Sequence, residues 1–229
     1  MNKSRDLSLL SSMKATIKLS ITEKNGAVRN RTVAMTTKSF PGGLEKRFIR
    51  FVEPADVRGT SMLVIDHKDK ADEMWIYLPA LKKTRRIVSR DKGKSFMSSE
   101  FSNADMSSPT LSDFTHRHSA NSGNANTWLI ESIPKNEDIA SEYGYSKKIS
   151  HICMEKFHVQ KMEFYNFDNE LFKIIETKDI QSFRDGKYMI KNMIASNRIT
   201  GRKSEILFSN IDDRVSVEDS FFSVQNLER

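Results

Sequence analysis

The stretch that decides the fold runs from Phe51 to Met106 and contains FVEPADVRGTSMLVID (51–66), MWIYLPALKKTRRI (74–87) and KSFMSSEFSNADM (94–106). At its centre, the run MWIYL (74–78) is apolar at every position. Successive side chains of a strand point to opposite faces, so a strand with one wet face should alternate apolar and polar residues. Both faces of this strand are apolar, so each must be covered by a helix, by another sheet or by a ligand.

Hairpin patterns extend outward from this centre in both directions. On the N-terminal side, residues 14–21 alternate polar and apolar, which predicts a half-buried strand, and the following Asn25-Gly26 is a strong signal for a tight hairpin turn. On the C-terminal side, residues 147–212 predict a β-meander with turns at Asp168-Asn169, Asp185-Gly186 and Thr200-Gly201. About ten short strands at this spacing predict a mainly β protein, built as one antiparallel sheet that curls towards a barrel.

Helical patterns are few and short. We expect a helix over residues 6–13, a turn at Asn103–Met106 with Asn103 as its N-cap, and a further helical turn within residues 139–145. Residues 217–222 are expected to close the chain as a helical turn that packs its two phenylalanines inward. No linker or composition shift divides the sequence, so residues 1–229 are expected to form a single domain.

The composition is that of a folded protein with a modest basic excess. Hydrophobic residues make up 38% and charged residues 29% of the chain, which excludes a disordered protein. A net charge of +7 is compatible with nucleic acid, with anionic lipid or with solubility alone, and the mixing of 37 basic with 30 acidic residues favours solubility. No apolar run approaches the roughly 18 residues that a membrane-spanning helix requires.

Catalytic patterns are weak in this sequence. It contains no Gly-x-Ser-x-Gly motif, phosphate-binding loop or dinucleotide fingerprint. The single cysteine, Cys153, shares a predicted strand face with His151 and lies near His158, so a Cys–His pair is geometrically possible. The apolar neighbours of Cys153 favour an inert, buried thiol instead.

Patterns for metal or nucleic-acid binding are also incomplete. His116 and His118 share a strand face without a third ligand at a suitable spacing. The loop over residues 66–72, with Asp66, Asp69 and Asp72 around His67, lacks the glycine and glutamate of a calcium loop. The basic run at 82–86 has no interleaved aromatic residues to stack on bases, so a solvated strand end or a surface for acidic partners or anionic headgroups is favoured.

Apolar surface is the feature that these motifs leave unexplained. The chain has 14 Phe and 11 Met, many of them on predicted strands that are apolar on both faces. Such residues are ordinary core material. However, a curled sheet with few helices offers little protein to cover a second apolar face, and half-barrels are common ligand sites. Residue patterns alone leave both a packed core and a ligand cavity open.

The central stretch resembles the outer-membrane lipoprotein-sorting family, the LolA-like periplasmic carriers. The resemblance rests on F-x-x-P-A-D-V-x-G-T (51–60), W-I-Y-L-P-A-L (75–81), R-R-I (85–87) and S-F-M-x-S-x-F-S-x-x-D-M (95–106), in this order and spacing. It continues more loosely through F-Y-N-F-D-N-E-L-F-K (164–173) and D-S-F-F (219–222), and so covers most of the chain.

This resemblance implies a curved antiparallel half-barrel with short helices capping its concave face. It also implies a periplasmic carrier that holds a lipid or the acyl chain of a lipoprotein in the concave cavity on the way to the outer membrane. No catalysis, cofactor, metal or nucleic acid belongs to that role. Its partners would be lipid or acylated lipoprotein, a transporter of the resistance-nodulation-division or ABC type, and a transient membrane contact.

Site residues follow from placing this role on the matching motifs. We expect Trp75, Tyr77, Phe96, Met97 and Phe101 in the cavity or its lid, because aromatic and methionine side chains can repack around an acyl chain. Arg85 and Arg86 are expected at the rim, facing headgroups or a protein partner.

Two departures from the family pattern bear on these expectations. Ser98 stands where relatives often have glycine, which permits unusual backbone angles, so the conformation of this loop is an open question. Relatives begin with an export signal, and residues 1–13 lack its apolar core, so we expect the signal to have been removed from this sequence.

Two other classes of function remain open at this point. One is a ligand-free interaction module that docks on a transporter or another membrane protein. The other is an enzyme that uses His151, Cys153 or His158.

Overall fold

The structure, a computed structural model, describes residues 1–68, 70–108, 110–118 and 126–229. Within these ranges, thirteen strands form one antiparallel sheet in the order β6-β5-β4-β3-β2-β1-β13-β12-β11-β10-β9-β8-β7. The strands are β1 (Ser12–Thr22), β2 (Val28–Phe40), β3 (Leu44–Glu53), β4 (Ser61–Asp66), β5 (Glu73–Leu78), β6 (Lys83–Ile87), β7 (Phe114–His118), β8 (Thr127–Pro134), β9 (Lys147–Cys153), β10 (Val159–Tyr165), β11 (Leu171–Ser182), β12 (Tyr188–Asn197) and β13 (Lys203–Asp212). The predicted mainly β architecture is confirmed, with β6 and β7 as the edges of an open sheet.

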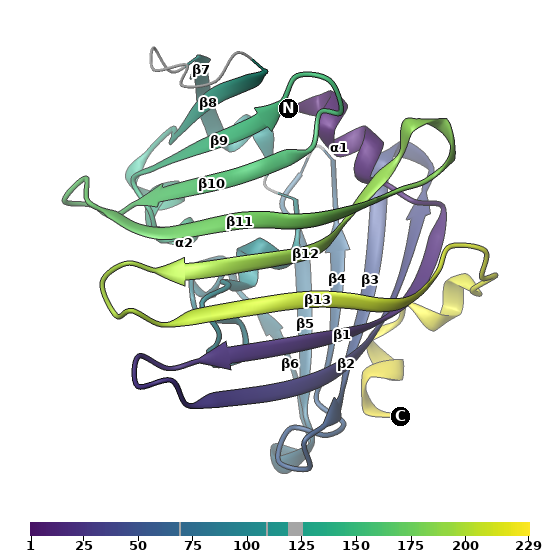
Figure 1. The fold of residues 1–229 in the computed structure, drawn as a ribbon. Helices are drawn as coiled ribbons and strands as arrows, with labels where there is room; N and C mark the ends of the chain where they lie inside the picture. The colour runs from purple at the N-terminus through teal and green to yellow at the C-terminus, as the bar shows by residue number, and fades with distance from the viewer. Residues whose placement is uncertain (69, 109, 119–125) are drawn as a thin grey trace.

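The sheet curls so far that its two halves face each other (Figure 1). Strands β9–β13 cross the front of the view, and β3–β6 stand behind them in a different direction. The long strands β1 and β2 connect the two halves, since β1 pairs with β13 and β2 pairs with β3. This is the half-barrel that the family resemblance implies.

Alternation along β1 shows how the sequence builds the concave face. Met13, Ile17, Leu19 and Ile21 are buried, whereas the intervening lysines and hydroxyl residues are half-buried or exposed. The same two-residue period runs through β9 and much of β13. The buried residues of each strand therefore line one side of the sheet, and the apolar ones of β1 and β13 belong to the main core within the curl.

The C-terminal end of the chain covers the second face of the central strand. Trp75 and Tyr77 of β5 point away from the main core and pack against the C-terminal segment, residues 215–229. Within this segment, Phe222 and Leu227 are almost fully buried. Protein rather than ligand therefore covers this face.

Two α-helices occur among the described residues, α1 (Asn2–Ser8) and α2 (Glu137–Tyr143). The prediction of a helix over residues 6–13 was wrong in its bounds, because Ser12 already pairs with β2 and strand pairing ends the helix earlier. The predicted turn at Asn103–Met106 is present, but its N-cap is Ser102, whose backbone N–H donates to the Asp105 carboxylate at 2.7 Å. Across the described ranges, neither helix is long and apolar enough to span a bilayer.

Candidate functional site

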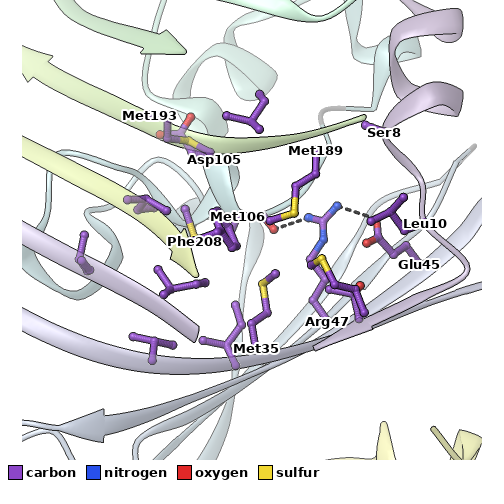
Figure 2. A pocket seen from close by; sticks show the side chains of 18 of the residues that line it. Ser8, Leu10, Met35, Glu45, Arg47, Asp105, Met106, Met189, Met193 and Phe208 are labelled. Carbon is purple, nitrogen blue, oxygen red and sulfur yellow. Dashed lines mark hydrogen bonds and ion pairs between the residues drawn. The ribbon is translucent and has the colours of Figure 1, made fainter. Parts of the chain in front are cut away.

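A pocket of about 220 Å³ lies on the concave side of the sheet (Figure 2). Its walls come from β1, β2 and β3 on one side and from β12 and β13 on the other. Typical wall residues are Leu19, Val33, Ile49, Ile206 and Phe208, each at an inward position of its strand. Residues 95–106, which we call the lid loop, supply Phe96, Asp105 and Met106 to the lining.

Methionine is concentrated in this pocket. Five of the eleven methionines of the chain line it: Met13, Met35, Met106, Met189 and Met193. Methionine has three rotatable side-chain bonds and a polarizable sulfur, so it can fill a space of irregular or changing shape. A wall built this way can adjust to a flexible apolar guest without loss of apolar contact.

One end of the pocket is polar and charged. The Arg47 guanidinium lies 2.7 Å from a Glu45 oxygen and 3.2 Å from Asp66, and it donates to the main-chain oxygen of Met106 in the lid loop. Burial lowers the pKa of Arg47, but the attraction of Glu45 and Asp66 outweighs burial and raises the pKa above its ordinary value. Arg5 of α1 reaches the same Asp66 at 2.7 Å, so helix, sheet and lid loop meet at one ion-pair network.

Asp72 belongs to this charged region, but its surroundings disfavour the ionised form of its carboxyl group. Burial and, to a smaller extent, the neighbouring Asp66 carboxylate together raise the pKa of Asp72 to about 6, against hydrogen bonds from Ser107 and the His67 N–H that lower it. Asp72 therefore titrates near neutral pH, while Asp66 is neutralised by two arginines.

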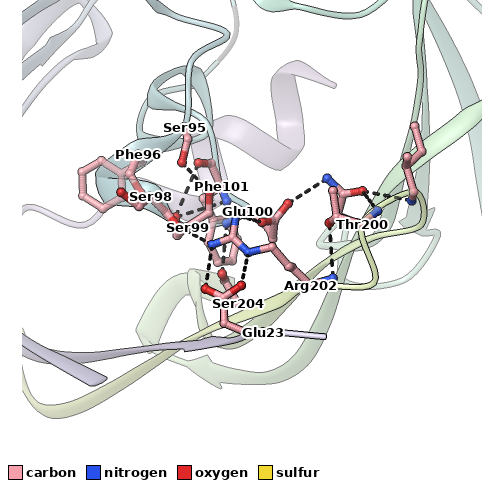
Figure 3. Close-up of polar contacts among 12 residues, drawn as sticks. Glu23, Ser95, Phe96, Ser98, Ser99, Glu100, Phe101, Thr200, Arg202 and Ser204 are labelled. Carbon is pink, nitrogen blue, oxygen red and sulfur yellow. Dashed lines mark hydrogen bonds and ion pairs between the residues drawn. The ribbon is translucent and has the colours of Figure 1, made fainter. Parts of the chain in front are cut away.

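The lid loop is fastened near its middle, at Glu100, to the hairpin between β12 and β13 (Figure 3). The Glu100 carboxylate, which is 8% exposed, accepts hydrogen bonds from Asn197 and from Arg202, both at 2.9 Å. Arg202 also donates to the main-chain oxygen of Ser98 at 2.8 Å, and Arg31 donates to that of Met97. These contacts tie the loop to β2 and to the hairpin between β12 and β13.

The C-terminal end of the lid loop is fastened by a buried ion pair. Asp105 accepts from Lys173 of β11 at 2.8 Å, and both side chains are largely buried. Lys148 of β9 lies nearby, where burial lowers its pKa to about 8, while Asp105 opposes and Lys173 reinforces this shift. The lid loop is thus held through one carboxylate near its middle and one near its C-terminal end.

The backbone of the lid loop shows which conformation serine adopts at position 98, where relatives often have glycine. Ser98 has a φ of 61° and Met97 a φ of 50°, so both occupy the left-handed region that glycine adopts most easily. Serine therefore keeps the glycine-like conformation rather than changing it.

The sequence-predicted pocket residues are divided between the two faces of the sheet. Phe96 lines the pocket, Met97 packs on the main core beside it, and Phe101, also of the lid loop, is fully buried in the main core. Trp75 and Tyr77 do not line the pocket, since both lie under the C-terminal segment.

The two predicted rim arginines lie on the edge strand β6. Arg85 and Arg86 are both exposed there. Arg85 approaches Asp91 at 3.7 Å, and Arg86 approaches Glu73 at 3.8 Å.

Sequence reasoning did not find most of the wall residues. The methionines of β1, β2 and β12 cannot be told apart from core residues by sequence, because an inward methionine of a core and one of a cavity have the same sequence pattern. The signal available was the apolar alternation of β1 and β13, which predicts their inward face but not an unfilled space.

The residues considered above for catalysis or metal binding lie apart from one another. His151 and Cys153 are half-buried on the face of β9 opposite the main core, and His151 lies 3.5 Å from Glu163. Both ring nitrogens of His116 are hydrogen-bonded, to Ser132 and to the main chain at Leu111, and burial lowers its pKa. Within the described ranges, no three His, Cys, Asp or Glu side chains are arranged to bind a metal, and Asp69 lies outside those ranges.

Comparisons with known proteins give a consistent picture. A family model described only as "-like: Uncharacterized protein" matches residues 43–229. Comparison with curated proteins gives no match.

Three solved structures share this fold over nearly the whole chain. A candidate outer membrane lipoprotein-sorting protein domain from Vibrio parahaemolyticus superposes with a TM-score of 0.87 at 26% identity, covering 100% of this chain and 99% of that one. A DUF1329 family protein from Desulfovibrio piger gives a TM-score of 0.87 at 24% identity, covering 99% and 95%. A LolA superfamily protein from Nitrosomonas europaea gives 0.73 at 15% identity, covering 97% and 94%. The chain therefore belongs to the family whose model matches residues 43–229, and its fold is that of the LolA-like proteins.

Proposed function

We propose that this protein is a non-enzymatic carrier that holds a lipid, or the acyl chain of a lipoprotein, in the concave pocket. The observation that carries the proposal is the pocket itself, an apolar space within a curved sheet, lined by five methionines and closed by a loop. The Vibrio parahaemolyticus domain, described as a candidate for outer membrane lipoprotein sorting, supports the same role. Residues 1–229 would act as one LolA-like domain.

The chemistry of the pocket favours an acyl chain over a compact polar ligand. Moving such a chain out of a membrane requires reburial of its surface, at about 0.8 kcal/mol per methylene. The pocket of about 220 Å³ is smaller than the roughly 300–1,000 Å³ of usual ligand sites. We therefore infer that cargo enters as the methionines and the lid loop move aside, with Phe96, Met97 and Phe101 in contact with it.

The setting of the carrier follows from the same family membership. We propose that it works in the periplasm, between a transporter of the inner membrane and the outer membrane. Arg85 and Arg86, exposed on β6, are the proposed contact for headgroups or for a protein partner.

The experiment that tests carriage is native mass spectrometry, with lipid extraction, on protein purified from its own periplasm without detergent. We expect a bound species with at least one long acyl chain. A homogeneous apo-protein that also fails to take up a fluorescent fatty acid would contradict carriage. That result, combined with capture of a transporter, would favour the ligand-free interaction module.

A further inference from the structure

The exposed apolar side chains of this protein gather at one end of the sheet. Because neighbouring strands are antiparallel, the turns β1–β2, β3–β4, β5–β6, β10–β11 and β12–β13 all lie at the same end, which we call the turn rim. In Figure 1, the turns β1–β2, β10–β11 and β12–β13 project along the left margin. Each of the five turns carries one exposed large hydrophobic residue within it or at its flanking strand end: Val28, Val52, Leu81, Phe167 and Ile199.

This distribution is not a general property of the surface. Among the described residues, seven large hydrophobics are exposed, and only Val88 and Leu207 lie away from the turn rim. Val88 follows β6 at the opposite end of the sheet, and Leu207 lies within β13. Single apolar side chains at separate turn tips do not form a groove for a folded partner, but each could enter a fluid surface independently.

Two neighbouring turns of the turn rim also carry an excess of positive charge. Thr22 pairs with both Val28 and Lys203, so the β1–β2 and β12–β13 turns are adjacent along the rim. Residues 22–29 and 197–203 contain five cations, Lys24, Arg29, Arg198, Arg202 and Lys203, against one carboxylate, Glu23. In the described part of the chain, Lys24, Arg198 and Lys203 take part in no ion pair. The next turn, with Phe167, carries two carboxylates and fits an anionic surface less well.

We propose that the turn rim, centred on Ile199 and Val28, is a docking surface for an anionic phospholipid bilayer. Ile199 is 66% exposed and lies between Arg198 and Lys203, so apolar insertion and attraction to headgroups act at the same place. The β12–β13 turn also holds the lid loop through Arg202 and Glu100, so docking would bring the lid to the membrane. The bilayer would be a partner of the proposed carrier, so the purpose of docking rests on the proposed function.

Vesicle flotation without cargo tests the contact separately from carriage. Wild-type protein should float with vesicles of phosphatidylethanolamine and phosphatidylglycerol, and less with vesicles of phosphatidylcholine alone. Ile199→Ser should lower partitioning about tenfold, since one apolar side chain loses its burial. The double variant Arg198→Ser/Lys203→Ser should lower it by at least about tenfold on the anionic vesicles, with a smaller effect at high salt.

The matched control is Val88→Ser, which removes an exposed aliphatic side chain at the other end of the sheet. It should float like the wild type. Equal effects of Val88→Ser and Ile199→Ser, or no flotation of the wild type, would overturn the proposal. The proposal would also be overturned if the protein did not bind vesicles and Ile199→Ser changed its oligomeric state. The turn rim would then be a contact between copies of this chain. Protein that carries lipid but never floats would refute the docking surface alone, whereas protein that floats but never carries lipid would refute carriage alone.

Discussion

At the scale of single residues, Ser98 shows how the lid loop tolerates a departure from the family pattern. Its φ of 61° places a Cβ in the left-handed region, where an L-residue costs about 1–2 kcal/mol. The loop keeps this conformation because Arg202 and Arg31 hold the main-chain oxygens of Ser98 and Met97. Contacts from the sheet therefore fix a backbone geometry that serine itself disfavours.

We expect Ser98→Gly to stabilise the protein. Glycine removes the left-handed strain, and part of the gain is offset by its larger entropy in the unfolded chain, so the free energy of unfolding should rise by about 0.5–1 kcal/mol. Urea unfolding followed by circular dichroism measures the change. Ser98→Ala keeps the Cβ and should show no such gain, and an equal gain in both variants would contradict the explanation from φ.

Asp72 predicts a pH dependence of stability. Its pKa rises from 3.8 to about 6 on folding, so between about pH 4 and pH 6 the folded protein binds more protons than the unfolded chain. The free energy of unfolding attributable to Asp72 therefore falls as pH rises through this window, by on the order of 2–3 kcal/mol, and is constant above it.

The substitution Asp72→Asn should flatten this part of the stability curve and make the protein more stable at pH 7. Asparagine keeps an oxygen for the His67 N–H at 3.0 Å and removes the charge next to Asp66. Urea unfolding at a series of pH values measures the difference from wild type. Asp213→Asn, at an exposed carboxylate, is the control, and an unchanged slope in Asp72→Asn would rule out Asp72 as the source.

At the scale of elements, the lid loop is held at two places by carboxylates that contact neighbouring strands in the middle of the sheet. Glu100 joins it to the β12–β13 turn, and Asp105 joins it to β11. The lid loop supplies few backbone hydrogen bonds to any strand, apart from its own internal turns. Its closed position therefore depends on these side chains.

We expect Glu100→Gln to loosen the lid loop locally. The amide carries no charge for Arg202, so opening of residues 95–101 should become easier by about 1–2 kcal/mol, an increase of roughly tenfold in amide hydrogen exchange. Exchange measured by mass spectrometry reports this region. Glu23→Gln removes the other carboxylate that pairs with Arg202, at 2.9 Å, but does not touch the lid loop. Equal loosening by both variants would show that Glu100 has no special role.

The C-terminal segment acts as the cover of the second sheet face. Leu227 is 1% exposed and packs in the cluster that includes Leu63 and Trp75. We expect Leu227→Ala to lower the free energy of unfolding by about 3 kcal/mol, because it leaves a cavity against β4 and β5. Urea unfolding measures the loss. Val224→Ala, a partly buried position in the same segment, should cost less, and the reverse order would contradict this packing.

At the scale of the whole molecule, curvature makes the pocket. Inward side chains of β1–β3 and of β12–β13 face one another only because the sheet bends between them (Figure 1). Carriage can therefore be tested by filling this space without touching the lid loop or the turn rim.

We expect Met193→Trp to abolish or strongly reduce lipid binding, by more than about tenfold, because the indole would occupy the pocket. Uptake of a fluorescent fatty acid measures this. Leu207→Trp is the matched control, since Met193 pairs with Ile206 across the sheet and Leu207, its neighbour in β13, is exposed. Normal uptake by Met193→Trp would place the cargo elsewhere.

Much of the fold could be predicted because its signals are local. Two-residue alternation marks β1, and turn residues mark the hairpins that connect the meander strands. Prediction from sequence fails where strand pairing between distant residues competes with a local preference for helix. Residues 9–13 have a helical pattern, yet Ser12 and Met13 join β1 because they pair with β2.

The alternating strands, the turns and the two-faced apolar strand at 74–78 can be predicted because they depend on residue order alone. What each apolar face meets depends on how the strands and the chain end are arranged in space. Trp75 and Tyr77 are covered by residues more than a hundred positions away, while the methionines of β1, β2 and β12 face an unfilled space. The physical reason is that alternation fixes the face to which a side chain points, but the curl of the sheet and the course of the chain end fix whether protein fills the space beyond it.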